Sequence, residues 1–279
     1  MKPMLAKKLP SKHLTFPCIV QPKLNGVRAL WIGGKLQSRD EHLWLPHVLP
    51  HITSTLRLSA SGIDLDGELY LHGLSLQQIN SRVAVNRNEP HRDVLAIEYH
   101  VFDIISDEPQ EVRAERLREL SREWKQTSVF AVETLYCASQ EFSDMCYKMW
   151  RQKHYEGLMY RKLGVPYGQL DVCGNQENRW HWLLKRKEFS DLVAEVVDCI
   201  EGNGQFANSL GAFLLRTSSG VLFSAGSGLT VQERVAYWAN RNDMPGTKVR
   251  VEYEMLSDGG VPLKPTIACV EDPDYGNHL

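Results

Sequence analysis

The sequence lacks the patterns that mark membrane proteins, zinc sites and disulfide-rich domains. No run of about 18 apolar residues occurs, which excludes a transmembrane helix. The N-terminal residues 1–8 carry charge without an apolar core, so they do not read as a secretory signal. The six cysteines are scattered without a C-x-x-C pair, so neither a zinc site nor a disulfide framework is supported. A reducing compartment fits best, which predicts a cytoplasmic protein.

The ten histidines form no H-E-x-x-H motif. His47 and His51 are four residues apart, but a surface or loop role is expected for them rather than a metal site.

A strong net charge is also absent: the 279 residues sum to −2, which gives no global electrostatic case for a nucleic-acid partner. The charge is unevenly spread, however. Residues 1–189 carry 26 Lys and Arg against 22 Asp and Glu, whereas residues 190–279 carry 6 against 12. Two domains with these boundaries are therefore predicted, and a polyanion should meet the first, with its net charge of +4, rather than the second at −6.

The most informative stretch is residues 21–28, Gln-Pro-Lys-Leu-Asn-Gly-Val-Arg. Asn25-Gly26 between two apolar runs predicts a tight hairpin in which both residues have φ > 0. Lys23 then lies at a strand end where a phosphate can approach. Its amine can act as a covalent nucleophile if nearby cations or a metal keep it partly deprotonated. An exposed lysine beside an ordinary turn would give the same local pattern.

Gly33-Gly34 predicts that the next strand turns back on itself, towards Arg39. Lys23, Arg28 and Arg39 are then expected on one three-stranded meander. Arg39 ends a strand, so it either projects towards the same site or is simply solvated.

Residues 63–71 and 96–105 are predicted to form strands that carry acidic groups. Asp66-Gly67 predicts a second tight turn, with Glu68 directly after the glycine. Asp103 lies in so apolar a run that it needs a partner, because an unpaired buried charge is costly. Phe102 is expected on the opposite face of that strand.

Three amphipathic helices are predicted from apolar residues that recur at helical spacing. Their stripes are Leu117, Leu120 and Trp124; then Phe142, Met145, Cys146 and Met149 after a Ser139 cap; and Val231, Val235 and Trp238 after a Thr230 cap with Glu233.

Two further strands are predicted to carry ionic groups in the last third of the first domain. Glu156 is the first residue of the apolar strand predicted at residues 156–162. Lys185 and Lys187 share one face of the strand at residues 180–187, and two ammonium groups about 7 Å apart suit a phosphate. An exposed basic strand would show the same alternation.

Five short motifs now stand in a fixed order: Lys-x-Asn-Gly-x-Arg at 23–28, Asp-Gly-Glu at 66–68, Phe-Asp-Ile at 102–104, Glu-Gly-Leu-Met at 156–159 and Leu-Leu-Lys-Arg-Lys at 183–187. In this order they resemble the covalent nucleotidyltransferases, and within them the small ATP-dependent DNA ligases of the bacteriophage type. The resemblance covers essentially the whole chain. It implies an α+β fold, with an antiparallel-sheet nucleotidyltransferase (ATP-grasp-like) domain followed by an OB-fold β-barrel domain.

The resemblance implies a monomeric enzyme that seals 3′-OH/5′-phosphate nicks in duplex DNA, in replication, repair or recombination. Lys23 would take AMP from ATP, the AMP would pass to the 5′-phosphate, and the 3′-hydroxyl would displace it. Mg²⁺ is the implied metal, with Mn²⁺ as a substitute. The implied contacts are Lys185 and Lys187 with the α-phosphate, Arg28 and Arg39 with the ribose or nick phosphate, Glu68 with the ribose or metal, Glu156 with the metal, Phe102 and Met159 with the two faces of adenine, and Gln21 with its edge.

Two positions depart from the family pattern. Asn25 replaces the usual aspartate, and Glu271 stands where related ligases carry an arginine that orients the pyrophosphate. Lys264 or another cation would then have to substitute for that arginine. Two alternatives remain open: an RNA ligase or capping-type nucleotidyltransferase, and a non-catalytic protein of the same fold that binds nicks or ends.

Overall fold

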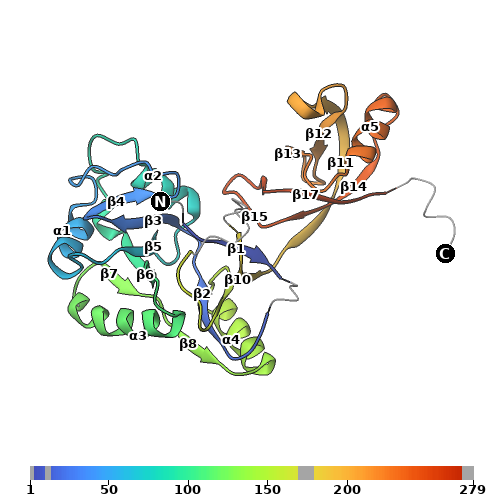
Figure 1. Cartoon of the computed structure of the whole chain (residues 1–279). Coiled ribbons are helices and arrows are strands. Elements are labelled where there is room, and N and C mark those ends of the chain that lie inside the picture. The colour runs from blue at the N-terminus through green and yellow to red at the C-terminus, as the bar shows by residue number, and fades with distance from the viewer. Residues whose placement is uncertain (1–2, 10–13, 169–178, 272–279) are drawn as a thin grey trace. The chain divides into compact units, whose positions relative to one another are not determined.

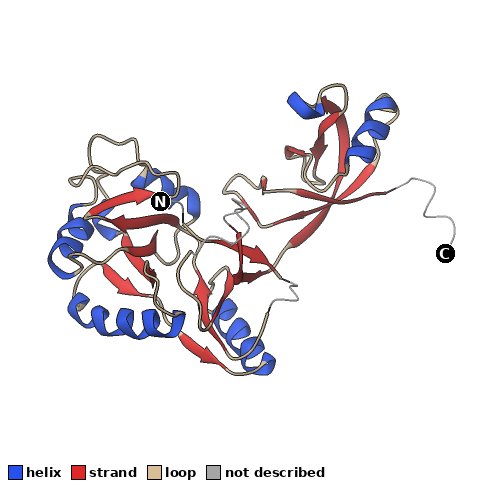
Figure 2. Ribbon diagram, in the orientation of Figure 1, coloured by secondary structure: helices blue, strands red, loops and turns tan. Residues whose placement is uncertain are grey.

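The computed structural model describes residues 3–9, 14–168 and 179–271. The chain divides into two compact units, Met1–Lys187 and Glu188–Leu279 (Figure 1). Both units are mixed, with more strand than helix (Figure 2). None of the described helices is long and apolar enough to cross a membrane.

Two five-stranded sheets frame the first unit. Sheet I contains β3 (Val27–Ile32), β4 (Lys35–Ser38), β5 (Leu65–Tyr70), β6 (Glu98–Ile104) and β7 (Val129–Ala131), and sheet II contains β1 (Leu5–Lys8), β2 (Cys18–Lys23), β8 (Leu135–Cys137), β9 (Gly157–Lys162) and β10 (Arg179–Lys187). Their orders are β4-β3-β5-β6-β7 and β1-β10-β9-β2-β8. Neighbouring strands are antiparallel except β6–β7 and β1–β10, so the predicted α+β fold built on antiparallel sheets is confirmed.

Four α-helices and two short 3₁₀ helices accompany these sheets: α1 (Pro50–Ser59), α2 (Leu76–Val83), η1 (Val94–Ala96), α3 (Gln110–Leu120), η2 (Ser121–Trp124) and α4 (Gln140–Gln152). Helix α2 contacts β3 and β5, α3 contacts β6, and α4 contacts β2, β8 and β9. Each sheet is therefore covered by helices on one face.

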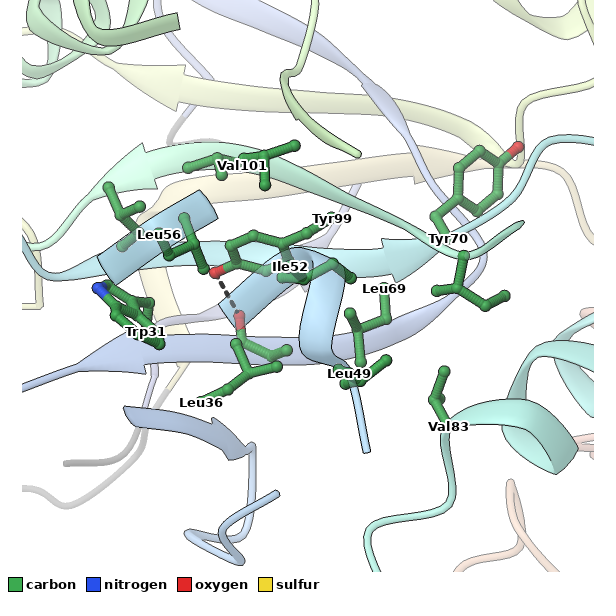
Figure 3. Close-up of a cluster of buried hydrophobic side chains, with 14 of the residues drawn as sticks. Trp31, Leu36, Leu49, Ile52, Leu56, Leu69, Tyr70, Val83, Tyr99 and Val101 are labelled. Carbon is green, nitrogen blue, oxygen red and sulfur yellow. Dashed lines mark hydrogen bonds between the residues drawn. The ribbon is translucent and has the colours of Figure 1, made fainter. Parts of the chain in front are cut away.

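The core of sheet I forms on that covered face. Figure 3 shows Ile52 and Leu56 of α1 among Trp31, Tyr99 and Val101 of the strands, all of them buried. The buried hydroxyl of Tyr99 has a hydrogen-bond partner, because it donates to the Ala29 carbonyl at 3.0 Å. Side chains alternate along a strand. The residues between these core positions, such as Arg28 and Glu68, consequently lie on the other face.

Sheet II follows the same rule. Val20, Leu158 and Leu184 pack with Cys146 and Trp150 of α4 in a second buried cluster. The alternate positions of β2, β9 and β10 therefore point away from α4. In each sheet, the charged residues that the sequence motifs single out lie on the face that the helices leave uncovered.

The predicted hairpin at Asn25-Gly26 is wrong. Strands β2 and β3 belong to different sheets, and neither residue has positive φ. Gly26 is required for another reason: a Cβ there would lie 2.3 Å from the Leu69 carbonyl oxygen. The expected meander fails with the hairpin, since Lys23 lies in sheet II and Arg28 in sheet I.

The predicted turn at Asp66-Gly67 is also wrong, because both residues lie inside β5. A Cβ on Gly67 would lie 2.6 Å from the His100 carbonyl oxygen and 2.7 Å from the Tyr99 ring. Close packing between neighbouring strands, and not a turn, demands this glycine.

Helix α4 is where the sequence predicts it, and the Ser139 hydroxyl accepts from the Phe142 N–H as its cap. Its predicted stripe is partly wrong. Met145 is 56% exposed, and the fully buried positions are Ser143, Cys146 and Trp150.

In its described residues the second unit has an antiparallel sheet of order β13-β12-β11-β14-β17 and a separate two-stranded sheet of β15 and β16. A bridge between Ser227 and Thr266 joins the chain after β13 to β17, and the Ile267 N–H donates to the Ser227 carbonyl at 2.8 Å. The two edges of the sheet are thus linked at one point, and no closed barrel forms in the described residues. The elements are β11 (Ser190–Glu201), η3 (Gly204–Phe206), β12 (Leu210–Arg216), β13 (Leu222–Ala225), α5 (Val231–Ala239), β14 (Lys248–Tyr253), β15 (Met255–Leu256), β16 (Pro262–Leu263) and β17 (Thr266–Glu271).

Helix α5 begins at the predicted Thr230 capping box, but its predicted apolar stripe is only partly right, since Trp238 packs on the core and the two valines do not. Val231 and Val235 are 67% and 54% exposed, and the buried residue is Arg234. The Arg234 guanidinium donates to the carbonyls of Leu210 and Gly211 at 2.8 Å each. The helix is therefore anchored to the sheet by an arginine where an aliphatic contact was expected.

Candidate active site between the two sheets of the first unit

The strand register of sheet II arranges the basic residues in rows. In one row, Gly157 on β9 pairs with Lys23 on one side and with Lys187 on the other. In the row two positions away, Met159 pairs with Gln21 and with Lys185. Cross-strand partners in a sheet lie on the same face. Lys23, Lys185 and Lys187 therefore share the uncovered face of the sheet.

Glu156 joins two of these lysines. Its Oε2 lies 2.5 Å from Lys23 Nζ and its Oε1 lies 3.5 Å from Lys187 Nζ. Its backbone N–H also donates to the Lys23 carbonyl at 3.0 Å. The side chains of Lys23, Glu156 and Lys187 are 20%, 12% and 2% exposed, so the ion pairs are shielded from water on most sides.

Glu68 and Arg28 face each other across β3 and β5 of sheet I. Glu68 Oε1 accepts from the Gly26 N–H at 3.1 Å. Burial raises the pKa of Glu68 to about 7, although the charges of Lys23 and Arg28 act in the opposite direction. A carboxylate that titrates near neutral pH beside an amine is typical of functional sites.

Arg28 is held by a buried carboxylate, because its guanidinium donates two hydrogen bonds to Asp66. Asp66 also accepts from the Tyr167 hydroxyl at 2.6 Å. The carboxylate of Asp66 raises the pKa of Arg28 against the opposing effect of burial. Arg28 therefore stays charged and fixed in direction.

Phe102 lies on β6 and is partly exposed. The guanidinium carbons of Arg28 and Arg161 each lie 5.2 Å from its ring centroid. Gln21 is buried at 2% exposure, and its Nε2 donates to the Phe102 carbonyl at 3.0 Å. The amide of Gln21 thus binds protein partners: its Nε2 donates to the Phe102 carbonyl and to Thr134 Oγ1, and its Oε1 accepts from Arg161 Nε.

Asp103 has the partners that the sequence demands. Arg113 donates to its two oxygens at 2.8 and 3.1 Å, and Arg161 donates to Oδ2 at 2.6 Å. The prediction of a buried, paired carboxylate is confirmed. Since Arg161 lies in sheet II and Asp103 in sheet I, this network ties the two sheets together.

The structure brings together most of the residues that the sequence singles out, and we name this set the inter-sheet site: Lys23, Arg28, Glu68, Phe102, Glu156 and Lys187, with Gln21, Met159 and Lys185 on the same strands. Arg39 lies apart, exposed in the turn after β4. Lys264 is on the second unit, 2.7 Å from Glu254. Glu271 is in β17, and its side chain lies outside the described residues.

Sequence reasoning missed Asp66, Arg161 and Tyr167 as parts of the site. Strand alternation carried a signal for two of them, since Asp66 is two residues before Glu68 and Arg161 is two residues after Met159. Tyr167 follows β9 in the chain, and its contact with Asp66 depends on how the two sheets meet.

The carboxylates of the inter-sheet site fit a divalent cation for which water molecules and phosphate oxygens supply most of the ligands. In the described part of the chain, no group of three or more His, Cys, Asp or Glu side chains is arranged to hold a metal ion by itself. Mg²⁺ is commonly held by only one or two carboxylates together with substrate phosphates. Glu68 and Glu156 supply two carboxylates beside Lys23, which suits Mg²⁺ better than a structural metal cage.

Comparisons with known proteins agree with this geometry. The family model for the ATP-dependent DNA ligase domain matches residues 3–185, and a model for a DNA ligase OB-like domain matches residues 201–270. No curated protein sequence matches. A solved Lig E DNA ligase shares 22% identity and a TM-score of 0.80, over 97% of this chain and 99% of that one.

Two viral structures have the same fold at lower similarity. A Chlorella virus DNA ligase-adenylate has 22% identity and a TM-score of 0.53, covering 97% of this chain and 98% of its own. The ATP complex of the bacteriophage T7 ligase has 15% identity and a TM-score of 0.52, with the same coverage. Because the ligase-domain model spans well over half of the chain, this protein belongs to the ATP-dependent DNA ligase family.

Proposed function

We propose that this protein seals nicks in duplex DNA through a covalent adenylate on Lys23. The observation that carries the proposal is the position of Lys23 Nζ, 2.5 Å from Glu156, which is itself 3.5 Å from Lys187. An amine with an adjacent carboxylate and a second cation is equipped both to attack a phosphate and to bind it.

In the first step Lys23 Nζ attacks the α-phosphorus of ATP. An N–P bond forms, the bond from that phosphorus to the bridging oxygen breaks, and pyrophosphate leaves. The proton lost by Nζ has Glu156 Oε2 as its nearest acceptor. Catalysis of this kind rests on positioning and on neutralising the phosphate oxygens, which is the work we assign to Lys185 and Lys187. Bound Mg²⁺, held by Glu68 and Glu156, would add positive charge at the phosphates.

The adenosine is assigned to the sheet I side of the site. Phe102 would stack on the base with Met159 on its other face, and Arg28 and Glu68 would bind the ribose. The predicted contact of Gln21 with the adenine edge is revised. The buried amide of Gln21 already donates to the Phe102 carbonyl, so we propose that Gln21 holds Phe102 in place.

The later steps act on DNA. The AMP passes to the 5′-phosphate at a nick, and the 3′-hydroxyl then displaces it. The matches to DNA ligase models in both units support DNA over RNA as substrate. We assign Arg39 to the nick phosphate, because it is exposed at a strand end. We further propose that the protein is a monomer and acts in the cytoplasm.

The test is intact-mass measurement after incubation with ATP and Mg²⁺. The protein should gain the mass of one AMP, and Lys23→Ala should abolish the gain. Lys35→Ala, at the exposed first position of β4, is the matched control and should keep it. An AMP adduct that survives Lys23→Ala would refute the assignment of the nucleophile. Nicked DNA and nicked RNA duplexes, offered to the adenylated protein, then separate the two ligase classes.

A further inference from the structure

Arg161 is a buried arginine that the proposed reaction leaves unused. Its side chain is 3% exposed, and it lies two residues after Met159 on β9, on the face of the inter-sheet site. Its Nε donates to Gln21 Oε1 at 2.7 Å and its Nη1 donates to Asp103 Oδ2 at 2.6 Å. One guanidinium therefore bridges β2 and β6 from its place on β9.

This guanidinium contacts the ring of Phe102, as that of Arg28 does, and it also reaches the Phe102 backbone through Gln21. Arg161 Cζ lies 5.2 Å from the ring centroid, a distance at which cation and aromatic ring attract. Arg161 also takes the Gln21 oxygen, which leaves Gln21 Nε2 to donate to the Phe102 carbonyl at 3.0 Å and to Thr134 Oγ1 at 2.9 Å. The orientation of the Gln21 amide is thus set by Arg161.

Asp103 does not need Arg161 to be neutralised. Arg113, with a fully buried side chain, already binds both Asp103 oxygens at 2.8 and 3.1 Å. The contacts of Arg161 with the Gln21 oxygen and with the Phe102 ring are therefore additional to the neutralisation of Asp103. They point to a role for Arg161 at the ring it contacts, beyond pairing with Asp103.

We propose that Arg161 is a positioning residue that sets the selectivity for the adenine base by fixing Phe102. The proposal rests on the proposed function, in which the base stacks on that ring. A base is discriminated only when its polar edge meets fixed partners at a fixed depth. A loosened Phe102 lets other purines settle at the same site.

The experiment measures adenylylation and guanylylation of Lys23 by intact mass, with ATP and GTP as separate substrates. Arg161→Met should raise the KM for ATP at least tenfold, change kcat less, and lower the ATP-over-GTP ratio of kcat/KM at least tenfold. Arg161→Lys should fall between, because one ammonium cannot bridge Gln21 and Asp103 as the planar fork does. Lys162→Met, at the next and exposed position of β9, should match the wild type.

A double-mutant cycle with Phe102→Leu isolates the route of the effect. If Arg161 acts through the ring, the two substitutions together should cost less selectivity than the sum of the two alone. The ratio does not depend on the folded fraction, so loss of stability cannot imitate the result. An unchanged ratio in Arg161→Met, or full additivity in the cycle, would overturn the proposal. A wild-type protein that forms no adduct with ATP would instead refute the proposed function.

Discussion

The amine at the centre of the site is already paired before any nucleotide arrives. Lys23 and Lys187 share the carboxylate of Glu156, and Glu68 lies near enough to Lys23 for their charges to interact. The triphosphate of ATP is a competing anion for both lysines. Charge-assisted bonds to phosphate are among the stronger interactions in proteins, so ATP binding should release Glu156 from part of its ion pairing and free an acceptor for the proton of Lys23.

His51, outside the inter-sheet site, is a half-buried histidine. It lies in the first turn of α1, where its Nε2 donates to the Ile97 carbonyl at 2.8 Å. Its Nδ1 is buried without a partner among the described residues. Burial lowers its pKa, and the positive end of the helix dipole acts in the same direction. The expected surface or loop role is therefore wrong for His51, which lies within α1 and is half-buried.

The lowered pKa of His51 predicts a pH dependence of stability. The unfolded chain binds a proton more readily than the folded one, so the stability that depends on neutral His51 is present above its unfolded pKa and is lost as the pH falls. The melting temperature of the wild type, compared with that of His51→Gln, should decline between pH 7.5 and 5. His42→Gln, in an exposed loop, controls for loss of a titrating group. A wild-type-to-variant difference that stays constant over this range would contradict the prediction.

At the scale of single elements, close strand contacts decide the geometry of the site. A Cβ on Gly157 would lie 2.1 Å from the Arg186 carbonyl oxygen and 3.0 Å from Lys187 Cα, both in the neighbouring strand. Gly157 therefore allows β10 to approach β9, and that approach brings Lys187 to Glu156.

Replacing Gly157 with alanine should consequently harm both stability and chemistry. Overpacking of this kind costs about 1–3 kcal/mol, and the displaced Lys187 should slow Lys23 adenylylation at least tenfold. Thermal melting and the rate of AMP adduct formation measure the two effects. Gly259→Ala is the control, since the nearest atom to its added Cβ is Ser257 Oγ at 3.9 Å. Normal melting and a normal rate in Gly157→Ala would show that β10 adjusts without cost.

The elements also show what sequence can and cannot predict. Strand alternation correctly places Lys185 and Lys187 on one face, and caps place α4 and α5, because these are local properties. The expectation that Phe102 and Asp103 lie on opposite faces is wrong, because the register of the β5–β6 ladder shifts at Phe102 and Arg161 contacts both side chains. The hairpin at Asn25-Gly26 fails because the glycine serves a contact with Leu69, more than forty positions away in the chain. Such contacts depend on which strands become neighbours in a sheet, here β3 and β5, and the spacing of residues along one segment does not reveal this.

Roles that depend on a buried network are similarly hidden. The Asp103 sequence context demands a partner without naming it, and the structure supplies two arginines from different elements. The Arg234 anchor in α5 and the exposed Met145 in α4 likewise follow from which neighbour packs there. The motifs predict which residues form the site, whereas their supporting contacts come from the fold.

At the scale of the whole molecule, the weak net charge sets how the protein can hold DNA. The chain totals −2, and only the first part has a positive balance. A grip on duplex DNA must come from local cations such as those of the inter-sheet site and the exposed Arg39. Each phosphate contact releases counterions, so binding weakens with salt in proportion to the number of contacts.

Nick sealing should therefore fall steeply as salt is raised from 50 to 200 mM, by about tenfold or more for a few phosphate contacts. Lys23 adenylylation by ATP should fall less over the same range, because it engages one small ligand and no extended polyanion. Both rates can be followed in one preparation, by single-turnover sealing of pre-adenylated protein and by adduct formation. Arg39→Gln should make the plot of log sealing rate against log salt concentration less steep by about 0.9, the value for one phosphate contact. It should leave adduct formation nearly unchanged. Sealing that is as flat in salt as adenylylation would mean that DNA is held chiefly by contacts other than ion pairs.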